Sequence, residues 1–311
     1  MNAVIELTEL TKTYSSRRGS RRGLTELSLR VNAGEVLGYL GPNGAGKSTT
    51  IRLMLDLIRP TSGGIRVLGL DPRADAVALH RRIGYLAGDF VVDGRQRAGE
   101  CLAFLGNLRG GVPARRIAEL ADRLELDLSA RVKSLSKGNR QKVGLVQAFM
   151  HHPELLVLDE PTSGLDPLVQ QTFLDLVAEA KAAGQTVFMS SHIMSEVEAV
   201  ADRVAIIREG RLVATDTVAG LRARSFLRVR IDFAAPVAAE EFAALPGVTD
   251  VALEPARNGS VLTCRVDGSP DALVKAAARH TVIGLRADDQ DLEELFHAYY
   301  TGERTAARPA A

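Results

Sequence analysis

The strongest constraint on the fold of this 311-residue chain is a glycine-rich segment, residues 41–49, with the pattern GxxxxGK[ST]. A run typical of a buried strand, residues 35–40, leads straight into it, and from Lys47 apolar residues follow at helical spacing until Pro60. In this order of strand, glycine loop and helix, backbone N–H groups and the helix N-terminus can surround one anion. The segment therefore predicts a phosphate-binding loop in an α/β fold.

Each position of this loop has a chemical reason. Glycines let the backbone turn its N–H groups toward one phosphate group, the ammonium of Lys47 can reach the β- and γ-phosphates, and the hydroxyl of Ser48 can ligate Mg²⁺. The candidate nucleotide-binding residues of the loop are Gly41, Pro42, Asn43, Gly44, Ala45, Gly46, Lys47, Ser48 and Thr49.

A second chemical signal is an apolar strand, residues 155–158, that ends in two carboxylates, Asp159 and Glu160. Carboxylates at the carboxyl end of a parallel strand complement the lysine loop, because that edge is where α/β sheets bind ligands. We predict that Asp159 holds Mg²⁺ and that Glu160 orients and polarises the attacking water.

Composition argues against several other classes of protein. The 39 basic and 38 acidic residues leave a net charge of +1, so no overall field attracts nucleic acid, and no nucleic-acid partner is expected. Cys101 and Cys264 lack the spacing of a metal site and are expected to be buried thiols. No signal peptide is apparent, and no apolar run approaches the ~18 residues that a membrane helix needs, so we expect the chain not to cross a bilayer by itself.

The remaining pattern predicts two domains. Helical spacing dominates residues 88–134, and strands and helices then alternate up to residue 207, which predicts a largely parallel, helix-covered sheet. Residues 227–286 read strand, helix, strand, strand, helix, strand, the order of a ferredoxin-like module. A last helix is predicted at residues 291–300, and the tail 301–311 is expected to be disordered.

Three further segments give the chain a family resemblance. Residues 135–139 read Leu-Ser-Lys-Gly-Asn, residues 158–167 read Leu-Asp-Glu-Pro-Thr-Ser-Gly-Leu-Asp-Pro, and residues 190–192 read Ser-Ser-His. Together with the loop at 41–49, they resemble the signature, Walker B, D-loop and switch histidine of ABC-type ATPases, over about residues 4–221.

The resemblance implies a P-loop ABC ATPase domain at residues 1–224, with a RecA-like core, a β-subdomain and a helical subdomain at about 88–150. A small α+β ferredoxin-like accessory domain would follow at 225–300. The implied ligands are ATP and Mg²⁺, the latter on Ser48 and Asp159. The implied assembly is a head-to-tail dimer in which ATP lies between the Walker A loop of one copy and the signature of the other.

The resemblance also suggests roles for residues outside the loop. Ser136 and Gly138 would donate hydrogen bonds to the γ-phosphate from across the dimer, and Asp166 would lie on the dimer seam. His192 would contact the γ-phosphate. Tyr14 falls where the family stacks an aromatic ring on adenine, although a core tyrosine that ends a strand is the alternative.

The chain departs from the family pattern in two places. The signature has Lys137 in place of its first glycine and Asn139 in place of glutamine, which leaves Ser136 and Gly138 unchanged. Gly88 stands where the family carries a glutamine that contacts Mg²⁺, and Asp89 is a candidate replacement. Four arginines within residues 15–22 could contact phosphate, but a solvated hairpin tip is the default interpretation.

These features favour the ATP-hydrolysing subunit of a transporter, partnered by a second copy of itself and by a separate membrane permease, at the cytoplasmic face of the membrane. The Lys-Gly signature and the ending at residues 291–296 are similar to bacterial drug and antibiotic exporters of the tetronasin type. An importer ATPase whose C-terminal domain binds a regulatory ligand is the alternative. A soluble ABC ATPase without a transport role is a third reading, but the chain lacks the coiled-coil insertion or tandem ATPase domains usual in that class.

Overall fold

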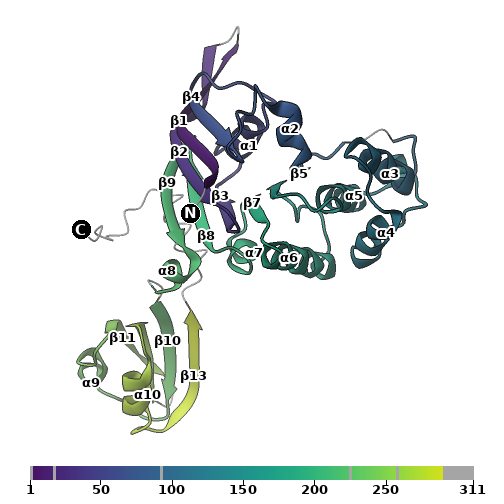
Figure 1. The fold of residues 1–311 in the computed structure, drawn as a ribbon. Coiled ribbons are helices and arrows are strands. Elements are labelled where there is room, and N and C mark those ends of the chain that lie inside the picture. Colours follow the sequence, from purple (N-terminus) through teal and green to yellow (C-terminus); the bar gives the residue numbers. More distant parts are fainter. Residues whose placement is uncertain (1–2, 17–18, 92–93, 224–225, 257–258, 290–311) are drawn as a thin grey trace. The chain divides into compact units, whose positions relative to one another are not determined.

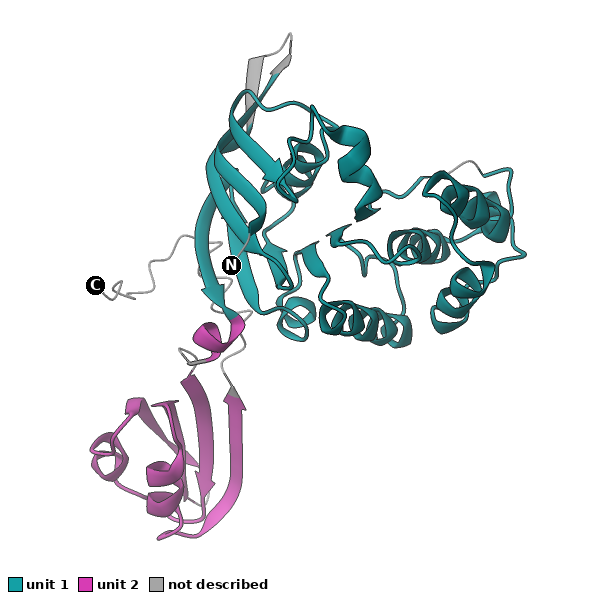
Figure 2. Cartoon of the chain, viewed as in Figure 1, with its two compact units in different colours: residues 1–217 teal, residues 218–311 magenta. Residues whose placement is uncertain are grey.

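The fold, a computed structural model, is described for residues 3–16, 19–91, 94–223, 226–256 and 259–289. The chain divides into two units, residues 1–217 and 218–311 (Figure 2). Within the described ranges, every helix is too short or too polar to span a membrane. The predicted helix at 291–300 and the tail at 301–311 lie outside the described residues.

The first unit contains a sheet of six strands in the order β5-β6-β7-β3-β8-β9 (Figure 1). All neighbouring pairs are parallel except β8 with β9, which confirms the predicted, largely parallel sheet. Strands β3, β6 and β7 are buried along their whole length, which explains their continuous apolar sequences. The strands are β3 (Val36–Leu40), β5 (Ile83–Leu86), β6 (Leu155–Asp159), β7 (Thr186–Ser191), β8 (Arg203–Arg208) and β9 (Arg211–Thr217).

Helices cover this sheet and form a separate cluster at its β5 end (Figure 1). Helices α6 and α7 pack against β7, α5 packs against β5, and α3 and α4 pack against α5 and against each other. The helices are α1 (Lys47–Met54), α2 (Ala76–Arg81), α3 (Ala98–Leu108), α4 (Ala114–Arg123), α5 (Lys137–Phe149), α6 (Pro167–Ala182) and α7 (Met194–Glu198), with a 3₁₀ turn at Val132–Ser134.

An antiparallel sheet in the order β2-β1-β4 lies beside the first sheet and shares its core. Its strands are β1 (Ala3–Ser16), β2 (Gly19–Asn32) and β4 (Ser62–Val67). One apolar cluster joins the two sheets and includes Ile5 and Leu27 from the antiparallel sheet and Tyr39 and Phe188 from the parallel one. This shared core makes the two sheets one packed body.

The structure corrects one expectation from the sequence and adds strands that the sequence pattern does not predict. The first helix was expected to continue to Pro60, but α1 ends at Met54 because Asp56 adopts a left-handed φ of 50°. Residues 62–67, beyond the predicted helix stop at Pro60, carry no predicted element, whereas β4 begins at Ser62 and pairs with β1. Strands β5 and β9, at the two edges of the six-stranded sheet, also do not follow from the sequence pattern.

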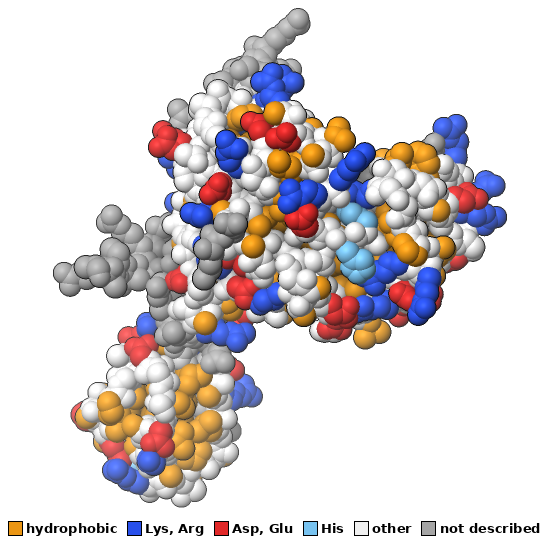
Figure 3. Space-filling model, in the orientation of Figure 1, with side chains coloured by type: hydrophobic (Ala, Val, Ile, Leu, Met, Phe, Trp, Pro, Cys, Tyr) orange, Lys and Arg blue, Asp and Glu red, His pale blue; other side chains and the backbone are white. Residues whose placement is uncertain are grey.

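The second unit has its own core and a four-stranded antiparallel sheet in the order β11-β12-β10-β13. Side chains of β10, β12, α9 and α10 fill that core, and hydrophobic side chains also show on the surface of this unit (Figure 3). The elements are α8 (Val218–Ala223), β10 (Phe226–Phe233), α9 (Ala239–Ala243), β11 (Val248–Ala256), β12 (Gly259–Asp267), α10 (Asp271–Ala277) and β13 (Val282–Asp289). Both cysteines, one in each unit, are buried thiols, as expected.

Candidate active site

The loop at residues 41–46 connects β3 to α1, and its shape depends on glycine. Gly46, at the helix N-cap, has a φ of 114°, and a Cβ there would lie 2.9 Å from the carbonyl oxygen of Gly23. A larger residue would be both strained and in collision with the backbone. Behind the loop, the backbone N–H of Gly210, in the turn between β8 and β9, donates to the carbonyl oxygen of Ala45 at 2.8 Å. The loop is thus held by the close approach of Gly46 to Gly23 and by the hydrogen bond from Gly210 to Ala45.

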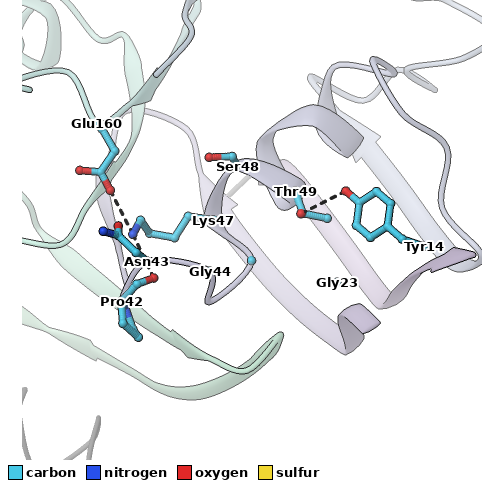
Figure 4. A pocket seen from close by; sticks show the side chains of 10 residues that line it. Tyr14, Gly23, Pro42, Asn43, Gly44, Lys47, Ser48, Thr49 and Glu160 are labelled. Atoms are coloured by element: carbon cyan, nitrogen blue, oxygen red, sulfur yellow. Dashed lines mark hydrogen bonds and ion pairs between the residues drawn. The ribbon is translucent and has the colours of Figure 1, made fainter. Parts of the chain in front are cut away.

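Lys47 is buried, with 6% of its surface exposed, and its ammonium lies over the loop (Figure 4). Its Nζ donates to the carbonyl oxygens of Gly41 at 2.5 Å and Pro42 at 3.4 Å. The same nitrogen lies 3.0 Å from Oε1 of Glu160. A phosphate group that entered the loop would therefore meet a pre-positioned positive charge.

The two carboxylates predicted at the end of β6 have different surroundings. Asp159 is 4% exposed, and its Oδ1 accepts a hydrogen bond from the hydroxyl of Ser190 at 2.6 Å. Glu160 is half-buried, and its Oε2 lies 2.7 Å from Nδ1 of His192. The carboxylate of Glu160 thus contacts both Lys47 and His192, and the structure brings these three predicted site residues together.

Glu160 also has an unusual backbone, with a left-handed φ of 49°. This conformation costs a residue with a Cβ about 1–2 kcal/mol, so surrounding contacts must maintain it. Its N–H faces both the carbonyl oxygen of Ser190, at 3.2 Å, and the hydroxyl oxygen of Ser190, at 3.1 Å. The side-chain amide of Gln141 donates to the carbonyl oxygens of Glu160, at 3.2 Å, and Pro161, at 3.1 Å.

Ser48 and Asp159 line one cavity of about 500 Å³, together with Gly88 and Asp89. A hydroxyl and a carboxylate are the oxygen ligands that Mg²⁺ prefers, so the residues present fit this ion. A Cβ at Gly88 would lie 3.4 Å from Oδ2 of Asp159, so the glycine leaves this oxygen uncovered on one side. In the described part of the chain no three His, Cys, Asp or Glu side chains cluster to hold a metal, so phosphate oxygens and water would supply the other ligands.

Tyr14 lies at the opposite end of the loop, in a pocket of about 540 Å³ (Figure 4). Its hydroxyl is 3.2 Å from the hydroxyl oxygen of Thr49, and 38% of its surface is exposed. The ring packs on Gly23, where a Cβ would lie 2.7 Å from Cε2 of the tyrosine. An exposed aromatic ring at the rim of the pocket is suited to stacking on a planar base.

Within the signature, Lys137 lines the cavity that contains Ser48 and Asp159, whereas its neighbours Ser136 and Gly138 do not. Ser136 caps α5, where its Oγ accepts the N–H of Asn139 at 3.2 Å. Gly138 packs so closely on the backbone of Gly164 that a Cβ would lie 2.3 Å from its carbonyl oxygen. Among the described residues, neither Ser136 nor Gly138 lines the cavities that contain Lys47 or Asp159. The structure therefore does not bring these two residues to the loop of the same chain.

The segment that follows Glu160 is held by several side chains. Lys137, the unusual residue of the signature, donates to the hydroxyl of Ser163 at 3.1 Å. Asp166 caps α6 and accepts the N–H of Val169 at 3.0 Å, and this hydrogen bond lowers the pKa of its carboxyl group.

Sequence reasoning missed Gln141 and Glu196. Oε2 of Glu196, on α7, accepts hydrogen bonds from the hydroxyls of Thr162 at 2.8 Å and Ser191 at 3.0 Å. These two partners lie next to the Glu160 segment and to His192. The signal that could have found Gln141 is its polar side chain at the start of a stretch of α5, residues 141–149, that is buried.

The arginine-rich segment is partly described. Arg21 and Arg22 lie in β2, whose backbone pairs with Tyr14 and Thr13 of β1, while residues 17–18 lie outside the described residues.

Comparisons with known proteins identify the family of this chain. The model of the ABC transporter family matches residues 24–163. The bacitracin transport ATP-binding protein BcrA of Enterococcus faecalis is 31% identical over 304 residues, which is 95% of this chain and 96% of that protein. The daunorubicin/doxorubicin resistance ATP-binding protein DrrA of Streptomyces peucetius is 38% identical over 235 residues, 73% of this chain and 70% of that protein.

A solved structure described as the ATP binding subunit of an ABC transporter superposes with a TM-score of 0.65 at 31% identity. The match covers 70% of this chain and 92% of that one. The loop, the acidic strand end and the histidine thus occur on the fold of this family. The chain belongs to the ABC transporter family and is an ATP-binding subunit and ATPase of that family.

Proposed function

We propose that this chain is the ATP-hydrolysing motor subunit of a drug or antibiotic exporter and that it works as a dimer with a separate membrane permease. The observation that carries the ATPase chemistry is the carboxylate of Glu160, which lies within 3.0 Å of both Lys47 and His192. The export direction rests on similarity to proteins named for bacitracin transport and for daunorubicin and doxorubicin resistance.

In the proposed reaction, the loop at residues 41–49 binds the phosphates of ATP and Lys47 contacts the β- and γ-phosphate oxygens. Glu160 accepts a proton from water as the water oxygen attacks the γ-phosphorus. The bond from that phosphorus to the bridging oxygen breaks, and ADP leaves with the bond's electron pair. His192, which lies beside the Glu160 carboxylate oxygen that does not face Lys47, contacts the γ-phosphate. Bound Mg²⁺, held by Ser48 and Asp159, would neutralise charge on the phosphate oxygens.

Tyr14 is proposed to stack on the adenine ring, because its exposed face closes the far end of the loop pocket. The neighbouring ammonium of Lys12 lies 5.2 Å from the centre of the tyrosine ring. One pocket is lined by Tyr14, Lys47 and Glu160, so it offers a stacking ring and a phosphate-binding loop to a single nucleotide.

The proposed dimer is supported by two signature residues that line neither cavity of the site. Ser136 and Gly138 occupy the N-terminus of the 13-residue helix α5, where backbone N–H groups are available to an anion. We infer that they contact the γ-phosphate of ATP bound to a second copy, and that Asp166 lies at the seam between the copies. Each active site would then be composite.

For the domains, we propose a nucleotide-binding domain at residues 1–224, a ferredoxin-like accessory domain at 225–300 and a disordered tail at 301–311. The order β10, α9, β11, β12, α10, β13 and the antiparallel sheet support a ferredoxin-like topology. A cavity of about 270 Å³ on this sheet, lined in part by arginines and aspartates, is the feature that would support the alternative of a ligand-regulated importer. Since Arg230 and Arg265 already pair with Asp232 and Asp267, we favour a structural role.

The proposed permease would hold the chain at the cytoplasmic face of the membrane. Closing and opening of the dimer, driven by ATP binding and hydrolysis, would then be converted by the permease into passage of the cargo. Nucleic acid is not a proposed partner.

The test is Glu160→Gln, which keeps the size of the side chain but removes the base. We expect MgATP binding to persist, turnover to fall about 100-fold or more, and an ATP-dependent dimer to accumulate. ATPase assays, equilibrium binding and light scattering would measure the three. Glu119→Gln, at an exposed ion pair with Arg115, is the matched control. Unchanged turnover would falsify Glu160 as the base, and a monomer that binds ATP would exclude the dimer.

A further inference from the structure

Gln141 is a buried amide with two backbone acceptors in the catalytic segment. It is 3% exposed, and its Nε2 donates to the carbonyl oxygens of Glu160 and Pro161 at 3.2 and 3.1 Å. Glu160 has a left-handed φ of 49°, so its carboxylate direction depends on contacts that hold the backbone. Gln141 is one of these contacts, and it comes from a different element, the helix α5.

The same helix begins at the signature. Ser136 and Gly138 precede Gln141 by five and three residues, which is less than two helical turns, so they and Gln141 move together as part of one rigid helix start. Three more contacts fasten this helix start to the segment after Glu160. Lys137 donates to Ser163, Gly138 packs on Gly164, and Nζ of Lys142 lies 3.8 Å from Asp166.

These contacts give α5 two functions in one chain. Ser136 and Gly138 at its N-terminus line neither of the cavities beside the loop of their own chain, while Gln141 donates to the backbone of the glutamate that acts on the nucleotide of that loop. A displacement of the helix start would therefore change the backbone at Glu160.

We propose that Gln141 is a positioning residue that couples the two nucleotide sites of the dimer. The inference rests on the proposed function, in which the signature contacts ATP held by the partner. When that ATP is bound, Ser136 and Gly138 hold the start of α5, and the amide of Gln141 holds Glu160 in the orientation that accepts a proton from water. Glu160 of one chain thus acts efficiently only when the other site is filled.

The experiment uses the full chain and Gln141→Met, which preserves length and packing but removes both N–H donors. ATPase rates are measured against ATP concentration, with binding and ATP-dependent dimer formation measured in parallel. The parent should show a Hill coefficient above 1. In the variant we expect a coefficient close to 1 and a kcat lower by about 10- to 100-fold, with ATP affinity within about twofold of the parent.

Gln147→Met is the matched control, because Gln147 is a buried glutamine of the same helix that makes none of the hydrogen bonds to Glu160 or Pro161. It should behave as the parent. If Gln141→Met does not fold, Gln141→Asn replaces it, since its amide is one methylene too short to reach both carbonyls, and the same loss of cooperativity is expected.

Mixed dimers separate positioning from a general loss of packing. One chain carries Glu160→Gln, so only the other chain hydrolyses ATP. Gln141→Met should slow turnover when it is in the chain with the intact Glu160, and should leave it unchanged when it is in the inactive chain. Equal effects in both chains, or an unchanged Hill coefficient in the uniform variant, would overturn the coupling. A parent that hydrolyses ATP as a monomer would instead remove the proposed dimer, and the inference with it.

Discussion

At the scale of single residues, the site is organised around Glu160, whose carboxylate lies 3.0 Å from Lys47 and 2.7 Å from His192. Its left-handed backbone adds about 1–2 kcal/mol of strain, which the contacts of Ser190 and Gln141 must offset. The two carboxylates and the lysine loop were predictable from the sequence. The strain was not, because a backbone dihedral of this kind depends on distant partners.

Lys47→Ala should act at binding rather than at chemistry. Its loss removes the charge-assisted contact to phosphate and leaves the Glu160 carboxylate facing the incoming anion, so MgATP affinity should fall at least about tenfold. Titration calorimetry or a fluorescent nucleotide would measure it. Lys275→Ala, at an exposed ion pair of the second unit, should bind as the parent does. Equal affinity of Lys47→Ala and the parent would mean that the loop is not the phosphate site.

His151 should make stability depend on pH. Burial, and then the positive charge of Arg109, lower the pKa of His151 from 6.5 to about 4. The folded state therefore binds fewer protons than the unfolded state between these values, so the contribution to stability is present above pH 6.5 and is lost as the pH falls toward 4. The loss should be on the order of 2 kcal/mol, since the imidazole is only partly buried.

Urea unfolding at several pH values would measure this contribution. In His151→Gln, the free energy of unfolding should fall less steeply between pH 7 and pH 5 than in the parent, by about 1 kcal/mol or more. His152→Gln, at an exposed neighbour, should keep the parent's slope. Identical slopes for His151→Gln and the parent would exclude the effect.

At the scale of elements, the site depends on how the start of α5, the segment after β6 and the turn between β7 and α7 are joined. Glu196 on α7 joins two of these, because one carboxylate oxygen accepts the hydroxyls of Thr162 and Ser191. Ser191 precedes His192, and its hydroxyl oxygen also accepts the N–H of Ile193 at 3.0 Å. The position of the histidine thus depends on a residue four positions later.

Glu196→Ala should disconnect these segments. We expect kcat to fall about tenfold with little change in KM for ATP, because the histidine and the Glu160 segment lose their common support while the phosphate loop is untouched. Glu196→Gln keeps an oxygen that accepts both hydrogen bonds and should restore most of the rate. Ser195→Ala, on the same helix and exposed, is the control. A Glu196→Ala enzyme with the parent's kcat would show that the support is not needed.

Sequence patterns predicted most of the buried strands but missed β4, β5 and β9, each of which lies at a sheet edge. Strand β5 has only four residues, too few for a clear period. Strand β4 begins Ser-Gly-Gly, and β9 alternates between exposed and half-buried side chains, so neither carries a strong apolar period. Gln141 and Glu196 were missed for another reason. Their hydrogen-bond partners are backbone carbonyls and hydroxyls in other elements, and the periodicity of a single sequence does not predict such pairs.

At the scale of the whole chain, the two units have separate cores, and every described residue of the proposed nucleotide site belongs to the first. Basic and acidic side chains are interspersed on its visible face (Figure 3), as the nearly equal totals of 39 and 38 lead one to expect. Anion binding is therefore a local property of the loop. Ser136 and Gly138, which line neither cavity of the site, are what a second copy would have to supply.

The turn between β8 and β9 limits how far the chain can be truncated without loss of support for the phosphate-binding loop. Gly210 donates to Ala45 behind the phosphate loop, and its own carbonyl accepts the N–H of Thr25 at 2.8 Å. The stretch recognised by the family model, residues 24–163, stops well before it. A fragment that contained only residues 24–163 would keep every glycine of the loop and Lys47. The carbonyl oxygen of Ala45, behind the loop, would lose its partner Gly210 and be exposed to water. Truncations intended to retain nucleotide binding should therefore end after Thr217, where β9 is complete.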